Sequence, residues 1–330
     1  MNRAILIAII ILVSLAIALL ALIPPHIHYP ARPGTSTAFT VGYTSATATP
    51  IKHVVIIILE NHSFDNIYGL YPPFGTPPIL NNITLSVMRP PLGLNATGVK
   101  LRYADSVILE DPWEGYLNYH IDWGGFGAMN GFINGSGSQS MVYLSYEQVP
   151  LLWDYAEEYV LADNYFSPDL ATTTPNRISY LVGYPVPMFS SSGCVVTFSQ
   201  TILYQLTEYN ISWAYFDYGY RQDQPLPPYP LSLIKGSSAY RSHYFNTSEF
   251  LIDLRSGNLP SVSFLMFTGG DGYDEHSALD LHPPYNITQG LVNLAYFIDA
   301  IEDSPYWNST VIFITFDEGG EASMTRYHHQ

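Results

Sequence analysis

The sequence predicts an α/β protein with a parallel sheet, and three observations lead to this fold class. Two runs of β-branched and aliphatic residues, 53–59 and 311–316, have the composition of strands buried on both faces. A third apolar run, 262–267, precedes an amphipathic pattern over 287–301 that leads into the run 311–316. Strand, helix and strand in this order are typical of a right-handed parallel crossover.

Polar side chains stand where two of these strands end. Glu60 and Asn61 follow the first run, and Asp317 and Glu318 follow the last. Open parallel sheets bind their ligands at the carboxyl ends of the strands. If the two strands are neighbours, four oxygen-bearing side chains meet at one edge of the sheet, which suits a hard cation. The alternative is that each strand simply ends in a polar loop.

Composition limits the classes of function. The 330 residues suffice for one large domain or two small ones, and 47% apolar residues are ample for a core. The formal charge of −16 argues against binding nucleic acid through its phosphates. Such an acidic chain suits surroundings in which carboxylates are partly protonated, because the self-repulsion then fades. A single cysteine, Cys194, excludes an intramolecular disulfide.

The first 50 residues predict a membrane segment and a linker. Residues 4–23 are almost wholly apolar, and a run of about 20 such residues can span a bilayer. Residues 1–25 are therefore expected to form an uncleaved signal anchor, with a signal peptide cleaved near 16–18 as the alternative. Arg3 would keep the N-terminus in the cytoplasm and place the remainder outside. A linker rich in Pro, Thr and Ser, 26–50, then precedes a domain that spans 51–330.

Glycosylation sequons give independent support for a location at the cell surface or beyond it. The pattern Asn-x-Ser/Thr begins at Asn82, Asn95, Asn134, Asn210, Asn246, Asn286 and Asn308. This density predicts a glycosylated surface.

The middle of the chain contains a candidate anion site. Helical spacing of apolar residues predicts a helix over 146–160, followed by strands at 161–166 and 212–217. Thr174 then has the properties of a helix N-cap, and Pro175 those of the first helical residue. Thr173 would lie just before the positive end of this helix, where free N–H groups can hold a phosphate. Alternatively, the threonines merely cap a helix.

Three motifs carry a resemblance to a known family. Residues 51–65 include the first polar pair, residues 163–166 precede 173–177, and residues 316–320 include the second polar pair. In this order they resemble the opening, nucleophile and late metal motifs of the phosphoesterase family that groups bacterial phospholipases C with acid phosphatases. The resemblance spans residues 51 to about 320.

The resemblance implies both a fold and a set of site residues. The family belongs to the alkaline-phosphatase-like superfamily, which implies a central, mostly parallel sheet with helices on both faces and a metal at the strand ends. Matching of the motifs implies Thr173 and His282 as catalytic residues. Arg177 of the nucleophile motif, the loop residue His120 and His276, which lies near a strand end, are candidates for substrate binding. The same matching implies Glu60, Asn61, Asp317 and Glu318 as metal ligands.

The chain departs from the family pattern at several positions. His62 stands where the family usually has Arg. Asp111 stands near the position of the first of two loop histidines, and His120 aligns with the second only after a shift. The family often has an Asp-His pair beyond 319–320, whereas this chain runs to 328–330 without one. Either a C-terminal part of the catalytic domain is missing or the site closes differently.

These residues permit metal-assisted phosphoester hydrolysis. A threonine hydroxyl is a weak nucleophile that a divalent cation can activate, and the cation also polarises a phosphoryl oxygen. One Ca²⁺, Mg²⁺ or Mn²⁺ ion is expected, with Zn²⁺ or iron left open by the nearby histidines. The leading hypothesis is an extracytoplasmic acid phosphatase that acts on small phosphomonoesters. A phospholipase C that acts on phospholipid head groups and a surface glycoprotein without activity are the alternatives. No nucleic-acid partner is expected, and the N-terminal helix would provide the membrane contact.

Overall fold

The computed structural model describes residues 49–69, 71, 102–124, 131–162, 165–186, 196–269 and 276–319. All of them belong to the second of two compact units, Thr47–Gln330. The predicted membrane segment 4–23 and nearly all of the linker 26–50 lie outside the described residues. Within the described part, no helix combines the length and the apolar character needed to cross a bilayer.

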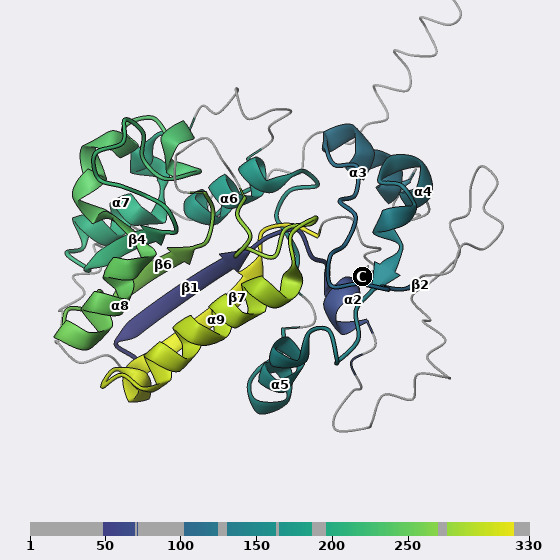
Figure 1. Cartoon of the computed structure of the whole chain (residues 1–330). Coiled ribbons are helices and arrows are strands. Elements are labelled where there is room, and N and C mark those ends of the chain that lie inside the picture. The colour runs from purple at the N-terminus through teal and green to yellow at the C-terminus, as the bar shows by residue number, and fades with distance from the viewer. Residues whose placement is uncertain are drawn as a thin grey trace, which may run out of the picture. The chain divides into compact units, whose positions relative to one another are not determined.

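A five-stranded parallel sheet forms the centre of this unit, in the order β5-β4-β6-β1-β7 (Figure 1). Its strands are β1 (His53–Leu59), β4 (Trp213–Asp217), β5 (Tyr244–Asn246), β6 (Val262–Met266) and β7 (Thr310–Phe316). Every pairing in the sheet is parallel, which confirms the predicted fold class. A separate parallel pair joins β2 (Arg102–Tyr103) to β3 (Val142–Tyr143).

Helices surround this sheet. Within the described residues they are α2 (Phe64–Tyr68), α3 (Tyr116–Trp123), α4 (Phe132–Gly135), α5 (Pro150–Glu158), α6 (Thr173–Val182), α7 (Ile202–Glu208), α8 (Thr247–Ser256) and α9 (Ile287–Glu302). Short 3₁₀ turns cover Ser138–Ser140, Phe198–Gln200, Leu231–Leu233, Ser237–His243 and Trp307–Ser309. The predicted helices 146–160 and 287–301 correspond to α5 and α9, and α5 begins at its proline.

The place of β1 in the sheet explains its unbroken apolar run. It pairs with β6 on one side and with β7 on the other, so neither of its edges meets solvent. β7 is an edge strand, and the expectation that the run 311–316 is buried on both faces is wrong. Its residues are only half-buried, and Phe313 is 55% exposed. The crossover through α9 therefore carries the chain from β6 past β1 to the edge of the sheet.

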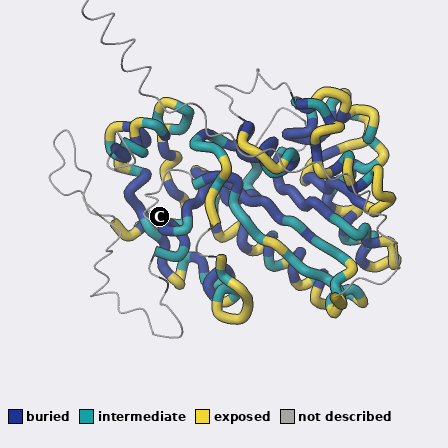
Figure 2. The backbone as a smooth tube through the Cα atoms, turned by 180° about the vertical axis from the view of Figure 1, so that it is seen from behind, coloured by how far each residue is buried: buried dark blue, intermediate teal, exposed yellow. Residues whose placement is uncertain are grey.

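Helices cover both faces of the sheet, and each face has its own hydrophobic core. On β1, Val55, Ile57 and Leu59 face one core, whereas Ile58 faces the other, as the two-residue period of a strand requires. The second core gathers side chains from α6 and α7. The predicted arrangement of helices on both faces of a parallel sheet is thus confirmed. Figure 2 shows the strands mainly in the buried and half-buried classes, with exposed residues at the outer turns.

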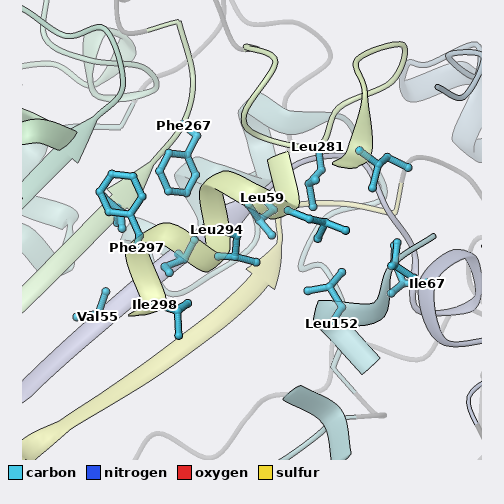
Figure 3. Close-up of a cluster of buried hydrophobic side chains, with 14 of the residues drawn as sticks. Val55, Leu59, Ile67, Leu152, Phe267, Leu281, Leu294, Phe297 and Ile298 are labelled. Carbon is cyan, nitrogen blue, oxygen red and sulfur yellow. The ribbon is translucent and has the colours of Figure 1, made fainter. Parts of the chain in front are cut away.

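The first core is built largely by α9. Its residues Leu294, Phe297 and Ile298 are buried and lie over β1, where Figure 3 shows them together with Leu59. Because Leu59 immediately precedes the predicted ligand Glu60, this packing holds the end of β1 in place. The core therefore positions the candidate site as well as stabilising the fold.

The start of α6 differs from the prediction by two residues. Thr174 was expected to be the N-cap, but Thr172 holds that place and Thr173 is the first helical residue. The side chain of Asn176 explains the difference. It donates to the Thr172 carbonyl at 3.1 Å and accepts from the Asp169 amide at 2.9 Å, which closes the preceding turn early. Thr173 thus lies in the first turn rather than before it.

The predicted strand 161–166 does not form at its described residues, 161, 162, 165 and 166. Tyr165 and Phe166 are exposed, so these apolar side chains do not cover a sheet. A short apolar run becomes a strand only where a neighbouring strand pairs with it, and periodicity alone does not reveal that neighbour.

Two of the sequon asparagines cap helices. Asn246 accepts a hydrogen bond from the Ser248 amide at 3.0 Å, and Asn286 accepts one from the Thr288 amide at 2.9 Å. An N-cap Asn followed two residues later by Ser or Thr satisfies the sequon pattern for a structural reason. Glycosylation therefore stays a prediction.

A buried carboxyl group joins the ends of β4 and β6. Asp217, the last residue of β4, accepts hydrogen bonds from the amide of Thr268 at 3.1 Å and from its hydroxyl at 2.8 Å. Burial raises the pKa of Asp217 to about 7, although the bonds from Thr268 lower it. The carboxyl is therefore partly protonated near neutral pH.

The substitution Asp217→Asn should flatten the pH dependence of stability. Because the pKa of Asp217 is raised on folding, its contribution to the free energy of unfolding is full below about pH 4 and is lost as the pH rises through 7. A pKa raised from 3.8 to about 7 corresponds to at most about 4 kcal/mol. Urea unfolding of both proteins from pH 4 to 8 measures this. The stability of the wild type relative to the variant should fall as the pH rises, and a constant difference would contradict the assignment.

The substitution Leu294→Ala should lower the free energy of unfolding by about 2–5 kcal/mol, because it leaves a cavity in the first core. Leu294 is wholly buried, whereas Val292 on the same helix is 65% exposed. Val292→Ala is the matched control and should change stability by less than about 0.5 kcal/mol. Denaturant unfolding compares the two, and equal effects would mean that α9 does not face the core as described.

Candidate active site

Glu60 and Asp317 lie side by side at the carboxyl end of the sheet. Leu59 pairs with Phe316 in the parallel register of β1 and β7, and the amide of Asp317 donates to the Leu59 carbonyl at 3.1 Å. The two strands are therefore neighbours, as predicted. Both acidic side chains are wholly buried. Two carboxylates buried this close together need a positive charge between or beside them.

Arg177 of α6 supplies such a charge. Its Nε donates to Asp317 Oδ2 at 3.0 Å, and its Nη2 contacts Glu60 Oε1. The guanidinium is itself buried. Burial raises the pKa of Glu60 well above its usual value, against the lowering effect of Arg177. The residue predicted to bind substrate thus holds two predicted metal ligands in this structure.

Thr173 lies at the same place. It is the first residue of α6, it is 1% exposed, and its hydroxyl donates to Glu60 Oε2 at 3.3 Å. The side chain of the N-cap, Thr172, forms no capping hydrogen bond, so the first-turn N–H groups of α6 are not used by it. The predicted nucleophile therefore combines a buried hydroxyl, a carboxylate partner and a helix N-terminus.

Asn61 reaches a second group of side chains. Its backbone is left-handed, with φ of 62°, a conformation that Asn tolerates better than most residues. Its Nδ2 is 3.0 Å from His282 Nε2 and 3.5 Å from Asp111 Oδ1, and it also contacts Glu114 Oε1. Its Oδ1 is buried and has no hydrogen-bond partner among the described residues. Such an oxygen is suited to a cation.

Two of the three predicted histidines, His276 and His282, lie against each other with ring centroids 3.6 Å apart and ring planes tilted by 35°. His276 Nδ1 is 4.0 Å from Glu60 Oε2, so this ring lies beside the ion pair of Glu60 and Arg177. The ring of His282 lies beside the side chain of Asn61. Burial and the neighbouring His282 lower the pKa of His276 to about 3, and burial lowers the pKa of His282 to about 4. Both rings are therefore neutral near pH 7, as a metal ligand or a base must be.

The contact from α3 to the site comes from Tyr119 and not from the predicted His120. The Nδ1 of His120 hydrogen-bonds the Tyr116 carbonyl at 2.7 Å, and its ring stacks on Tyr116 within the same helix. The neighbouring Tyr119 hydroxyl donates to Glu318 Oε2 at 3.1 Å. Glu318 is buried, and its amide donates to Asp317 Oδ1 at 2.8 Å. All four predicted metal ligands thus lie at one end of the sheet, but they form two groups. Glu60, Asp317 and Glu318 are linked through Arg177 and the Glu318 amide, whereas Asn61 contacts His282, Asp111 and Glu114.

His62, where the family usually has Arg, has a structural role. Its Nδ1 is 2.6 Å from Asn66 Oδ1 and its Nε2 is 2.9 Å from the Leu281 carbonyl. The ring therefore ties the loop after β1 to the loop that carries His282.

Sequence reasoning missed three acidic residues of the site. Asp280 is wholly buried, and its Oδ2 is 3.9 Å from His276 Nδ1, while its carbonyl accepts from the Glu60 amide at 2.9 Å. Asp111 and Glu114 surround the Asn61 amide. No local pattern in the sequence marks Asp280, because it lies in a loop next to Leu281, whose φ is 76°.

The donor groups fit a divalent cation. Glu60, His276 and Asp280 each offer one ligand atom, and these atoms lie within 4.8 Å of one another. Thr173 is adjacent through its bond to Glu60. Oxygen and imidazole nitrogen donors at this spacing suit a divalent ion such as Mn²⁺ or Zn²⁺. The described residues could therefore hold a metal beside the hydroxyl of Thr173.

Comparison with known proteins gives relatives of one kind. Non-specific phospholipase C1 from Arabidopsis thaliana is 26% identical over 295 residues, which cover 82% of this chain and 53% of the relative. Non-hemolytic phospholipase C from Burkholderia pseudomallei is 23% identical over 91% of this chain and 47% of the relative. Phospholipase C A from Mycobacterium tuberculosis is 21% identical over 88% of this chain and 62% of the relative.

The alignments and a family model agree on the extent of the match. The chain spans 47–62% of the length of these three relatives. The model described as the phosphoesterase family matches residues 51–322, a range that holds all three motifs and most of the chain. The chain therefore belongs to the phosphoesterase family.

Proposed function

We propose that this protein hydrolyses phosphate esters by means of Thr173 as the nucleophile, with a divalent cation bound beside it. The observation that carries this proposal is the hydrogen bond from the buried Thr173 hydroxyl to Glu60 at the end of β1. The carboxylate that it bonds lies between the guanidinium of Arg177 and the ring of His276.

The surroundings of Thr173 suit the covalent step. The hydroxyl oxygen would form a bond to phosphorus while the bond from phosphorus to the leaving oxygen breaks. Glu60, whose pKa is raised by burial, would take the hydroxyl proton, and the leaving oxygen would take a proton from water. The N–H groups in the first turn of α6 would hold the phosphoryl oxygens. A bound cation would polarise the phosphoryl group and lower the pKa of the hydroxyl. In the second step the oxygen of water would form a bond to phosphorus, the bond from phosphorus to the threonine oxygen would break, and that oxygen would recover its proton from Glu60.

His282 would accept a proton or hold a cation in this scheme. Its pKa, lowered to about 4 by burial, leaves it neutral over most of the pH range. A neutral ring of this kind is poorly suited to protonate the leaving oxygen. His276 is likewise neutral over most of the pH range, because its pKa is lowered to about 3.

The names of the relatives support a proposal for the substrate class. The relatives compared are named phospholipases C, so we propose a phosphodiester substrate with a phospholipid head group. An acid phosphatase is the second candidate, because the formal charge of −16 favours work in acidic surroundings. We also propose that the protein acts outside the cytoplasm, on the basis of the apolar residues 4–23.

One assay separates the candidates. The purified full chain is incubated with p-nitrophenylphosphorylcholine, a diester, and with p-nitrophenyl phosphate, a monoester, each with and without a chelator between pH 4 and 8. Faster turnover of the diester that the chelator abolishes is expected. Turnover of the monoester alone, with an acidic optimum, would indicate an acid phosphatase. Turnover of neither substrate with metal present would indicate a protein that has kept the fold without catalysis.

The substitution Thr173→Ala should lower kcat by at least about 10³-fold, because it removes the nucleophile. Metal affinity should change little, since Thr173 brings no charge to the site. Asp317→Ala should lower both kcat and metal affinity, because a predicted charged ligand is lost and Arg177 loses a partner. Steady-state kinetics and metal titration measure these effects.

The neighbouring threonine provides the control. Thr172→Ala should leave kcat within a few-fold of the wild type, because this side chain makes no capping bond. Thr173→Ser should keep partial activity, because the hydroxyl remains while the methyl group that restricts its rotamer is lost. If Thr173→Ala retained activity that a chelator still abolished, attack by metal-bound water would replace the covalent mechanism.

A further inference from the structure

A second set of ligand atoms lies beside the first. Asp111, Glu114 and His282 each offer one atom, and these atoms lie within 4.8 Å of one another. His282 Nε2 is 3.6 Å from Glu114 Oε1, and His282 Nδ1 is 4.0 Å from Asp111 Oδ1. The two acids come from the segment before α3, and the histidine comes from the loop before α9. None of the residues that supply the first set belongs to this one.

The nitrogen of Asn61 lies in the middle of this set. Its Nδ2 contacts an atom of each of the three residues. An amide NH₂ group has two hydrogens and only a partial positive charge, so it does not satisfy three acceptors, two of them carboxylates. A divalent cation would satisfy all three.

The oxygen of Asn61 is the second indication of a ligand. The residue is only 3% exposed, yet its Oδ1 has no hydrogen-bond partner among the described residues. A buried oxygen left without a partner costs about 1–3 kcal/mol. If the amide turned, this oxygen would face the cation and the cost would be removed. The Asn61 oxygen would then be a fourth ligand, in place of an Nδ2 group that cannot satisfy its three neighbours.

The orientation of His282 is the third indication. Its Nδ1 contacts the carbonyl of Pro283, so Nδ1 carries the proton and Nε2 presents a lone pair. A histidine whose other nitrogen donates to a backbone carbonyl is held in the tautomer that metal-binding histidines use. That lone pair is directed at the Asn61 amide and is 3.6 Å from Glu114.

The charges of the second set also favour a bound cation. Among the described residues, Asp111 forms no ion pair with a lysine or an arginine, and the side chains beside it are those of Asn61, Glu114 and the neutral His282. Asp111 also stands near a position where the family usually carries a histidine. Two acids beside one imidazole make a site that attracts a cation.

We propose that Asp111, Glu114 and His282, with the oxygen of Asn61, form a second divalent-cation site. It lies next to the first set, since Glu60 and Asn61 are consecutive and the ring centroids of His276 and His282 are 3.6 Å apart. Two carboxylates, an imidazole and an amide favour Mn²⁺, Zn²⁺ or Fe²⁺ over Ca²⁺. Two adjacent cations would contact both the attacking and the leaving oxygen of a phosphoryl group. The expectation of one metal ion is thereby extended to a pair.

The test counts bound metal and does not depend on turnover. The purified full chain is stripped with a chelator, dialysed against Mn²⁺, and its metal content is measured by mass spectrometry. The wild type should bind two Mn²⁺ ions, and the double variant Asp111→Asn, Glu114→Gln should bind one. Glu110→Gln is the matched control, because it removes one charge from an exposed neighbour, and it should still bind two.

Electron paramagnetic resonance gives an independent readout. Two adjacent Mn²⁺ ions couple, so the six-line signal of an isolated ion should weaken as the wild type fills and should persist in the double variant. A wild type that binds one ion with an uncoupled signal would overturn the proposal, as would a double variant that keeps two. If the double variant does not fold, Asp111→Asn alone, at a side chain 43% exposed, and the wild-type titration decide the question.

Discussion

The buried guanidinium of Arg177 between Glu60 and Asp317 is the interaction on which the rest of the site depends. Both carboxylates lie at the ends of neighbouring strands and are wholly removed from solvent, so they would repel each other strongly without it. Because Arg177 follows Thr173 by about one turn of α6, the same ion pairs hold the Thr173 hydroxyl against Glu60. Removing one member of such a buried group typically costs about 3–5 kcal/mol.

One guanidinium does not balance the acids gathered at this end of the sheet. Asp280 and Glu318 are buried there as well, and both site histidines are neutral because burial lowers their pKa values. A phosphate ester brings further negative charge, which this environment alone would repel. A bound cation would offset this charge, so the electrostatics of the site support the proposed metal site. The second ligand set, around Asn61, also gathers acids without a lysine or arginine among the described residues, so the same electrostatic argument applies to it.

Where the structure departs from prediction, long-range contacts are the cause. The apolar run of β7 indicates a strand but does not reveal that the strand lies at the edge, where Phe313 is exposed. Residues around Thr174 match a helix start, yet bonds from Asn176 begin the helix earlier. His120 was predicted to bind substrate, but α3 presents the neighbouring Tyr119 to the site instead.

The sequence by itself determined the strand β1, the polar pair that follows it, the crossover through α9 and the family. Each of these is local in the chain, because side-chain period and the place where an apolar run stops are read over a few residues. Only the tertiary structure decided that β1 lies between β6 and β7, which brings Glu60 beside Asp317. It alone placed Asp280, Asp111 and Glu114 at the site, because these acids come from loops. Loop residues follow no period, and the strands that anchor the loops determine where they meet.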